Sequence, residues 1–301
     1  MAKLNLINPE QSDIKYEVIT FNDGQPHIKF QPLDRKALST DDITIICRLA
    51  TQDQLFILEQ AANVLHRHGL RIATLFITYL QGMRMDRVMN FEEPYSLELI
   101  ATRINALQAE HVYVVEPHSR VSLKLINNSE ALSVLETDAF DKCFVVAPDA
   151  GARQRLCEQY DKKNSDARFD KLLGVDFYPI SFCNKHRDPD TGYIDRLDVD
   201  DRCVEKLKTS NKPILVVDDL CDGGRTFVMC AEAIRRIKPD AELSITVTHM
   251  VNPKGIEVLA EHYDHVEFTD SFRYWTTESM PDNVTCISIT SLTENPMLHT
   301  K

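Results

Sequence analysis

The stretch "ILVVDDLCDGGRTF", residues 214–227, decides the fold of this chain. It opens with four uninterrupted aliphatic residues, Ile214–Val217, which is typical of a strand buried on both faces of a parallel sheet. Acids and two glycines follow, and residues 226–238 then show helical spacing of apolar residues before Pro239. The pattern predicts a strand, an acidic turn, a glycine loop and a helix. Open α/β sheets bind ligands at such carboxyl ends of strands.

The bulk composition limits the class of protein. The 301 residues are 43% hydrophobic and 27% charged, which is globular and long enough for two ordinary domains. A net charge of −12 argues against binding to nucleic acid or to an anionic membrane. The first residues lack a signal-peptide core and no apolar run reaches the roughly 20 residues of a membrane span. We therefore expect a soluble cytoplasmic protein whose partners are small molecules.

The eight cysteines are scattered and no pair has Cys-x-x-Cys spacing. Most of them lie in apolar stretches. This pattern predicts buried free thiols in a reducing compartment, not a metal site or a disulfide framework.

Strands and helices alternate along the chain. "YEVITF" and "PHIKF" flank "NDGQ" at residues 22–25, which predicts a β-hairpin. The strand candidates after it are residues 42–49, 71–80, 111–117, 143–148, 175–182, 214–220, 243–250, 265–271 and 284–290. Helical spacing covers residues 53–69, with Gly69 as C-terminal cap, and 96–108, with Ser96 as N-cap. This alternation predicts an α/β fold with mostly parallel sheets.

Nine strands and a hairpin are too many for one small sheet. The polar stretch at residues 136–142 is the expected boundary, which gives domains at residues 1–140 and 141–301. The last residues are expected to pack back on the first domain.

Polar residues follow several of the predicted strands. These are "YLQGMRMDR" (79–87), "EPHSR" with His118, "APDAGARQR" (147–155) and the opening stretch, to which "CNKHRDPDTGYID" (183–195) adds an expected exposed loop. Each has an ordinary structural explanation, because an Asp after a strand often caps a helix and charged loops are usually only solvated. Together they combine acids for Mg²⁺ or sugar hydroxyls, glycine amides for phosphate and cations for phosphate transfer. A Walker A motif is absent, which excludes an ordinary P-loop phosphotransferase.

The opening stretch resembles the phosphoribosyl-binding fingerprint of type I phosphoribosyltransferases, and the whole set resembles the ribose-phosphate diphosphokinase family. "FNDGQ" (21–25) stands for that family's Phe-x-Asp-Gly-Glu, and "YLQGMRMDR" for its Tyr-x-x-Tyr-x-Arg-Gln-Asp-Arg. "VVEPHS", "VVAPDAGARQR", "NKHR" and "TVTHM" match further segments in the same order. The resemblance covers most of the chain.

The resemblance implies two phosphoribosyltransferase-like, Rossmann-like domains related by pseudo-twofold symmetry. The implied reaction moves the β,γ-diphosphate of ATP to the anomeric hydroxyl of a 5-phosphorylated ribose, with Mg²⁺ as cofactor and AMP as product. The implied assembly is a homo-oligomer, a dimer or a hexamer.

The resemblance also implies roles for particular residues. The ribose hydroxyls would be held by Asp218 and Asp219, and the 5-phosphate by Asp222, Gly223, Gly224, Arg225 and Thr226. The ATP site would use Arg84, Asp86 and Arg87, with Phe21 and Asp23 from a neighbouring subunit. His118 and Asp149 would position Mg²⁺, and His118, Lys185 and Arg187 would serve catalysis.

The phosphate loop departs from the family pattern. The family usually has Asp-Thr-x-Gly-Thr, whereas this chain has Gly223 at the first threonine and Arg225 at a glycine. The lost side chain leaves room and the arginine adds a phosphate binder. Two acceptors stay open: ribose 5-phosphate, with the loop merely divergent, or ADP-ribose, which would give ADP-ribose 1-diphosphate for NAD synthesis. A phosphoribosyltransferase using phosphoribosyl pyrophosphate and a non-catalytic regulatory homologue are the rival classes.

Overall fold

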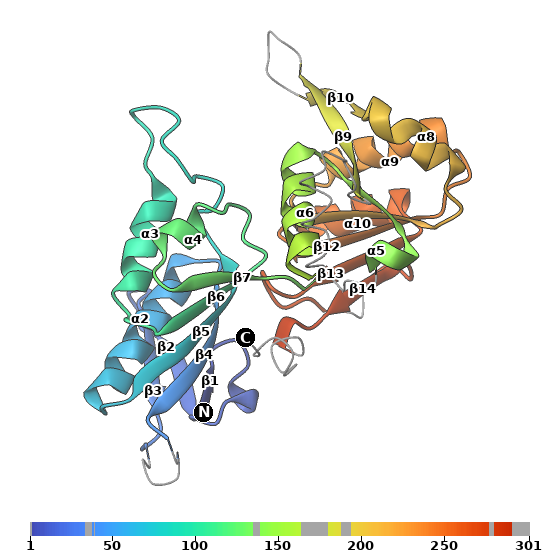
Figure 1. Cartoon of the computed structure of the whole chain (residues 1–301). Helices are drawn as coiled ribbons and strands as arrows, with labels where there is room; N and C mark the ends of the chain where they lie inside the picture. The colour runs from blue at the N-terminus through green and yellow to red at the C-terminus, as the bar shows by residue number, and fades with distance from the viewer. Residues whose placement is uncertain are drawn as a thin grey trace. The chain divides into compact units, whose positions relative to one another are not determined.

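The computed structural model describes residues 2–33, 38, 40–134, 139–163, 180–187, 194–276 and 280–290. Their contacts form two compact units (Figure 1). The first holds the residues up to Ser133 together with Ser271–Arg273, and the second holds Val134–Asp270 and residues 274–290. The division into functional domains at residues 1–140 and 141–301 stays a prediction. The C-terminal residues expected to pack back lie outside the described part.

The first unit is built on a five-stranded parallel sheet. Its strands, in spatial order, are β1 (Ala2–Asn5), β4 (Asp42–Leu49), β5 (Arg71–Leu80), β6 (His111–Val115) and β7 (Ser129–Leu132). The helices are α2 (Gln52–Arg67), α3 (Ser96–Asn105), α4 (Ser122–Leu125) and a 3₁₀ turn, η1 (Pro9–Gln11). Nine of the ten residues of β5 are buried, as expected for a central strand with both faces covered.

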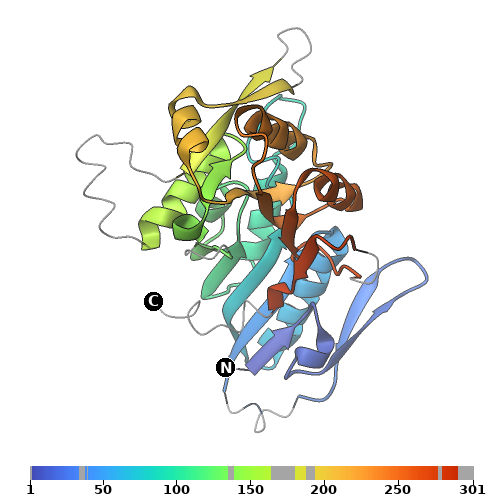
Figure 2. The same cartoon turned by 90° about the vertical axis from the view of Figure 1, so that its right-hand side faces the viewer.

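The predicted hairpin of this unit is present as β2 (Tyr16–Thr20) and β3 (Pro26–Phe30). It lies beside α2, as Figures 1 and 2 show. Gln60 of α2 fixes it, since its Oε1 accepts a bond of 3.0 Å from Ile28 N and its Nε2 donates one of 2.8 Å to Pro26 O. The hairpin is therefore attached at its β3 side, and most of β2 is exposed.

The N-terminal ends of α2 and α3 differ in their capping. α2 begins with a capping box in which Thr51 and Gln54 exchange side-chain to backbone bonds, and Gly69 follows it with φ +69°. The prediction that Ser96 caps the second helix is wrong. Ser96 is the first helical residue, and Tyr95 precedes it without a side-chain cap.

The second unit contains a seven-stranded sheet. In spatial order its strands are β10 (Ile194–Val199), β9 (Ile180–Arg187), β8 (Phe144–Ala147), β11 (Ile214–Cys221), β12 (Leu243–Met250), β13 (His265–Thr269) and β14 (Val284–Ile287). All neighbours are parallel except β9 and β10. The helices are α5 (Ala139–Lys142), α6 (Ala150–Lys163), α8 (Asp201–Thr209), α9 (Arg225–Ile237) and α10 (Pro253–His262). The expected α/β class with mostly parallel sheets is confirmed.

The exposed loop predicted at residues 183–195 is largely a β-hairpin. β9 pairs with β8 through Ile180–Phe182 and with β10 through Cys183–Arg187 (Figure 1). We call this antiparallel pair, Cys183–Arg187 with Ile194–Val199, the β9–β10 arm. Cys183 is buried, whereas Asn184 and His186 are exposed. The polar composition misled the prediction because β9 pairs with β8 only through Ile180–Phe182. The residues after Phe182 pair with β10 alone. Residues 188–193 lie outside the described part.

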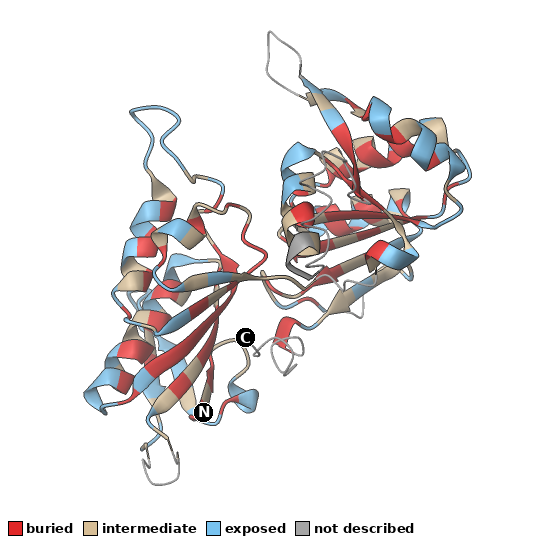
Figure 3. Ribbon diagram, viewed as in Figure 1, coloured by how far each residue is buried: buried red, intermediate tan, exposed pale blue. Residues whose placement is uncertain are grey.

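Burial follows the sheets. Each unit has its own apolar core, and Figure 3 shows buried residues along the strands with exposed residues on the outer faces of the helices. All eight cysteines are free thiols, and six of them are buried. Among the residues that the structure describes, no helix is long and apolar enough to cross a membrane.

Candidate functional site

Three adjacent strands of the second unit carry predicted site residues to one edge of the sheet. β9, β8 and β11 are neighbours, and β8 runs parallel to both. Lys185 lies near the carboxyl end of β9, and Asp149 follows β8. Asp218 and Asp219 lie in the second half of β11. The parallel arrangement therefore gathers three carboxylates, which we call the acidic centre (Asp149, Asp218 and Asp219).

Arg155 binds two members of the acidic centre. Its Nη2 lies 2.6 Å from Asp218 Oδ1 and 2.6 Å from Asp219 Oδ1. The arginine side chain is 20% exposed, that of Asp218 13% and that of Asp219 3%. Sequence reasoning did not select Arg155, although it stands within the matched segment at residues 147–155. The available signal was its place on the helix that follows Asp149.

Asp149 joins the acidic centre to β9. Its Oδ2 accepts a bond from Lys185 Nζ, and its Oδ1 accepts one of 2.8 Å from Ala152 N at the start of α6. Two residues predicted for one active site, the metal ligand and the catalytic lysine, are thus in contact. The side chain of Arg187 lies outside the described part, and its backbone pairs with Ile194.

The members of the acidic centre differ in how readily they ionise. Burial opposes the charge of Asp149, yet the Lys185 and Ala152 hydrogen bonds and the nearby cations hold its pKa below the usual range. For Asp218, burial and then the charge of Asp219 raise the pKa well above its usual value, against the attraction of Arg155. The centre therefore combines a firmly ionised carboxylate with a carboxyl that takes up a proton easily.

The glycine loop at residues 222–226 leads from β11 into α9. Gly224 has φ +80°, and a Cβ on it would lie 3.0 Å from Val258 Cγ1. Both conditions favour glycine. Below the loop, a Cβ on Gly255 would come within 2.5 Å of Asp222 O, so α10 packs closely against it. The loop ends at a helix N-terminus, whose amides and dipole suit a phosphate.

The two unusual residues of this loop differ in their surroundings. A Cβ on Gly223 would meet no atom within 4 Å, so the lost side chain leaves open space. Arg225 is exposed, and its Nη2 donates to Ile194 O at 3.2 Å. The guanidinium therefore lies against β10 at the edge of the loop.

Three of the residues predicted for ATP, Arg84, Asp86 and Arg87, lie in the loop after β5 of the first unit. Asp86 Oδ1 lies 2.8 Å from Arg87 Nε, and Asp86 Oδ2 accepts a bond of 2.6 Å from Ser119 Oγ. The hydrogen bond from Arg87 is the main reason why the pKa of Asp86 is lowered. Arg84 lies in the same loop as Asp86, and the half-buried His118 precedes Ser119. The loops after β5 and β6 are thus joined through Asp86.

The predicted metal pair does not lie within one unit. His118 belongs to the first unit and Asp149 to the second, so their joint site stays a prediction. Within the described parts of the chain, no cluster of three or more His, Cys, Asp or Glu side chains is arranged to hold a metal ion.

The hairpin tip carries the two remaining candidates. Phe21 is 45% exposed and its ring centroid lies 5.4 Å from that of His27. Asp23 Oδ1 accepts a bond of 3.1 Å from Gln25 N, and Gly24 has φ +89°. The tip is a tight turn that presents an aromatic ring to solvent.

The chain is similar to known proteins over most of its length. No family model matches it. It is 26% identical over 233 residues to a ribose-phosphate pyrophosphokinase of Sulfurisphaera tokodaii, covering 73% of this chain and 71% of that protein. It is 25% identical over 286 residues to one of Pyrococcus abyssi, covering 92% and 88%.

A solved structure shares the fold. The crystal structure of phosphoribosylpyrophosphate synthetase from Mycobacterium smegmatis matches with a TM-score of 0.70 at 19% identity, over 99% of this chain and 98% of that one. The matches confirm both the resemblance and the fold class inferred from the sequence.

Proposed function

On the premise of this resemblance, we propose that the chain is a Mg²⁺-dependent diphosphokinase acting on ATP and a 5-phosphorylated ribose. The anomeric hydroxyl oxygen attacks the β-phosphorus of ATP, and the bond from that phosphorus to the α,β-bridging oxygen breaks. The diphosphate moves to the sugar, AMP leaves and the hydroxyl proton is released. The observation that carries this proposal is the acidic centre beside the glycine loop, with Lys185 bound to it.

The acceptor site follows from the chemistry of the groups in the second unit. Adjacent carboxyl groups on β11 offer acceptor oxygens to the vicinal hydroxyls of a ribose, so Asp218 and Asp219 hold the sugar. Arg155 keeps these two carboxyl groups in one orientation. The amides of the glycine loop at the start of α9 bind the 5-phosphate. The proposal thereby uses each polar group at the end of β11.

The residues present fit a Mg²⁺ ion that arrives with ATP. Mg²⁺ is usually bound by one or two carboxylates together with substrate phosphates. Asp149 is the member of the acidic centre whose pKa is lowered, and His118 is the candidate from the first unit. When bound, Mg²⁺ would neutralise charge on the diphosphate.

Cations of this acidic chain serve the transferring group. Diphosphoryl transfer depends mainly on alignment and on charge neutralisation, so Lys185 and Arg187 on the β9–β10 arm act as electrostatic groups. Arg84, Asp86 and Arg87 bind ATP, and Phe21 and Asp23 reach the adenine from a neighbouring subunit of a homo-oligomer. The exposure of Phe21 supports this last role.

ADP-ribose is the second candidate acceptor. Its distal ribose has a free anomeric hydroxyl, and its 5-oxygen bears a diphosphate. The open space at Gly223 favours it, because a group larger than a terminal phosphate has room there. The exposed Arg225 at the edge of the loop can donate to a second phosphate.

The test measures AMP release from ATP and Mg²⁺ with ribose 5-phosphate and with ADP-ribose in parallel, with product masses. Release with either acceptor supports the diphosphokinase, and the ratio of the two rates identifies the acceptor. Gly223→Thr fills the space and is expected to lower the rate with ADP-ribose relative to ribose 5-phosphate. A phosphoribosyltransferase or a regulatory homologue would release no AMP with either acceptor, and that result would sink the proposal.

A further inference from the structure

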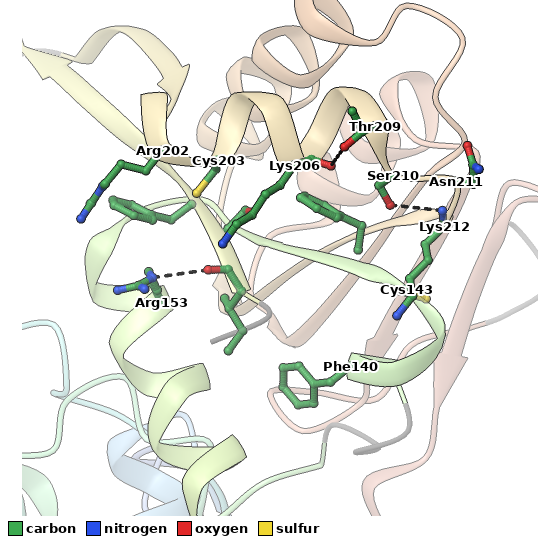
Figure 4. A pocket seen from close by; sticks show the side chains of 14 residues that line it. Phe140, Cys143, Arg153, Arg202, Cys203, Lys206, Thr209, Ser210, Asn211 and Lys212 are labelled. Carbon is green, nitrogen blue, oxygen red and sulfur yellow. Dashed lines mark hydrogen bonds between the residues drawn. The ribbon is translucent and has the colours of Figure 1, made fainter. Parts of the chain in front are cut away.

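A second concave site lies in the second unit, away from the acidic centre. It has a volume of about 680 Å³ and is lined by residues of α5, β8, α6, β9, α8 and the segment after α8 (Figure 4). This volume is within the range of small-molecule sites. Phe144 and Ile180, the first residues of β8 and β9, contribute to its wall. The pocket therefore lies toward the amino ends of these strands, whereas the acidic centre lies at their carboxyl ends.

Helix α6 contributes a residue to each of the two sites. Arg153 and Arg155 are two residues apart on this helix and serve different places. Arg153 Nε donates to Ile180 O at 3.4 Å, and its guanidinium lies 5.1 Å from the ring centroid of Phe182. Arg155 binds Asp218 and Asp219. The pocket is thus not an extension of the acidic centre.

Aromatic rings form the apolar part of the pocket. Phe140 and Phe182 are 3% and 6% exposed, and Phe144 is half-buried. Arg202 places its guanidinium 5.4 Å from the Phe182 ring centroid, and none of the described residues that line the pocket is Asp or Glu. Phe144, the most exposed of the three rings, offers an apolar contact to a ring-shaped ligand.

The charge of the pocket is opposite to that of the chain. Four of its described lining residues are cations (Arg153, Arg202, Lys206 and Lys212) and none is Asp or Glu, although the chain carries −12. Arg202 is neutralised by Asp200, which lies outside the lining. Within the described part of the chain, Lys206 Nζ has neither a hydrogen bond nor an ion pair, and Lys212 Nζ donates only to the Asp141 carbonyl.

Two lysines line the pocket from different sides. Figure 4 shows Lys206 and Lys212 reaching in from two sides, with Phe140 on the wall below. A phosphate monoester carries about −1.5 to −2 near pH 7, which two ammonium groups balance. Ser210 and Asn211 also line the pocket.

We propose that this pocket binds a small phosphate monoester whose other part is an aromatic ring. The ring lies against Phe144, and the phosphate lies between Lys206 and Lys212. The proposal does not rest on the diphosphokinase reaction, because it uses none of the residues assigned to that reaction.

Phenyl phosphate is the probe, and a thiol of the pocket gives a local readout. Cys143 lines the pocket and is half-buried, so a ligand there slows its alkylation by maleimide, as followed by peptide mass spectrometry. Binding at the glycine loop would leave this readout unchanged. The Kd comes from the concentration dependence of the protection.

Matched variants of α8 and of the segment after it separate the pocket from general charge effects. Lys206→Ala and Lys212→Ala are each expected to weaken protection about ten-fold or more, as for hydrogen bonds to charged groups. Lys208→Ala is the control, since Lys208 pairs with Glu205 and does not line the pocket. Far-UV circular dichroism and thermal unfolding check that each variant is folded.

The outcomes decide the proposal. It is supported if phenyl phosphate protects Cys143 in the unaltered chain and in Lys208→Ala, and if both lysine variants lose that protection. It is overturned if millimolar phenyl phosphate gives no protection. It is also overturned if phenol or inorganic phosphate alone protects equally well, because the ring or the charge would then play no part.

Discussion

Replacing Arg155 by Met is the most direct test of the acidic centre. This arginine is the cation bound to both Asp218 and Asp219, through a single nitrogen 2.6 Å from each. Methionine keeps much of the apolar stem on α6 and removes the guanidinium. Two neighbouring carboxyl groups, 13% and 3% exposed, then lose the guanidinium.

The expected cost is large for a single substitution. Removing one member of a buried ion pair costs about 3–5 kcal/mol, because the remaining charge stays buried without compensation. The partial exposure of Arg155 places the expected loss of unfolding free energy toward the lower end, about 3 kcal/mol at neutral pH.

The loss is expected to depend on pH. In the unaltered chain the pKa of Asp218 already lies well above its usual value, chiefly through burial and the charge of Asp219. A carboxyl with a raised folded pKa destabilises the native state. The penalty is full above the folded pKa and shrinks as the pH falls from there to the unfolded pKa. Without Arg155 the folded pKa rises further. The difference between variant and unaltered chain is therefore full above the variant's folded pKa and shrinks as the pH falls toward the folded pKa of the unaltered chain.

Urea unfolding followed by circular dichroism, at pH 7.5 and at several lower values, measures this difference. Arg153→Met is the matched control on the same helix, because its guanidinium lies over Phe182 and donates to Ile180 O. It should cost about 1 kcal/mol or less, independent of pH. Equal losses for the two variants, or a loss at Arg155 that does not change with pH, would refute the reasoning.

Three further predictions concern single groups. Lys185→Met is expected to raise the pKa of Asp149 in a carboxyl ¹³C titration, removing stability that is present above the unfolded pKa and lost as the pH falls through the folded one; an unchanged pKa would contradict the ion pair. Gly224→Ala should lower the free energy of unfolding in urea by about 1–3 kcal/mol, because φ is +80° and the new Cβ would lie 3.0 Å from Val258 Cγ1. Gly223→Ala should change it by no more than about 0.5 kcal/mol, because a Cβ there would meet no atom within 4 Å. Burial raises the pKa of Cys286 to about 11, so its alkylation near pH 8 should be about 100-fold slower in the native chain than in urea; equal rates by mass spectrometry would exclude this.

The sequence predicted best those elements whose side chains are buried on both faces. β4, β5 and β12 begin and end at the predicted residues, because long apolar runs have few competing interpretations. β1, β7 and β10 were missed, since they are short or polar strands at or near sheet edges. Their strand structure depends on neighbours that only the fold supplies.

The same distinction applies to the site. Strand-end acids and the glycine loop were predicted because periodicity places them locally, and the structure brings Asp149, Asp218 and Lys185 together. Arg155 was missed because its role depends on the packing of α6 against β11 and not on its own neighbours in sequence. The β9–β10 arm was taken for a loop because cross-strand pairing cannot be read from its polar residues.

The two ion pairs of the acidic centre have different consequences for a mechanism. Lys185 and Asp149 are 24% and 28% exposed, so solvent screens their attraction and separating them costs little. Arg155 holds Asp218 and Asp219 in a more buried setting, where separation is expensive. A lysine that can leave its carboxylate is suited to follow a phosphate during transfer. In the proposed reaction, an arginine that cannot leave would fix Asp218 and Asp219 before the sugar arrives. The different burial of their carboxylate partners therefore suits Lys185 to the proposed role of a mobile electrostatic group and Arg155 to that of a positioning residue.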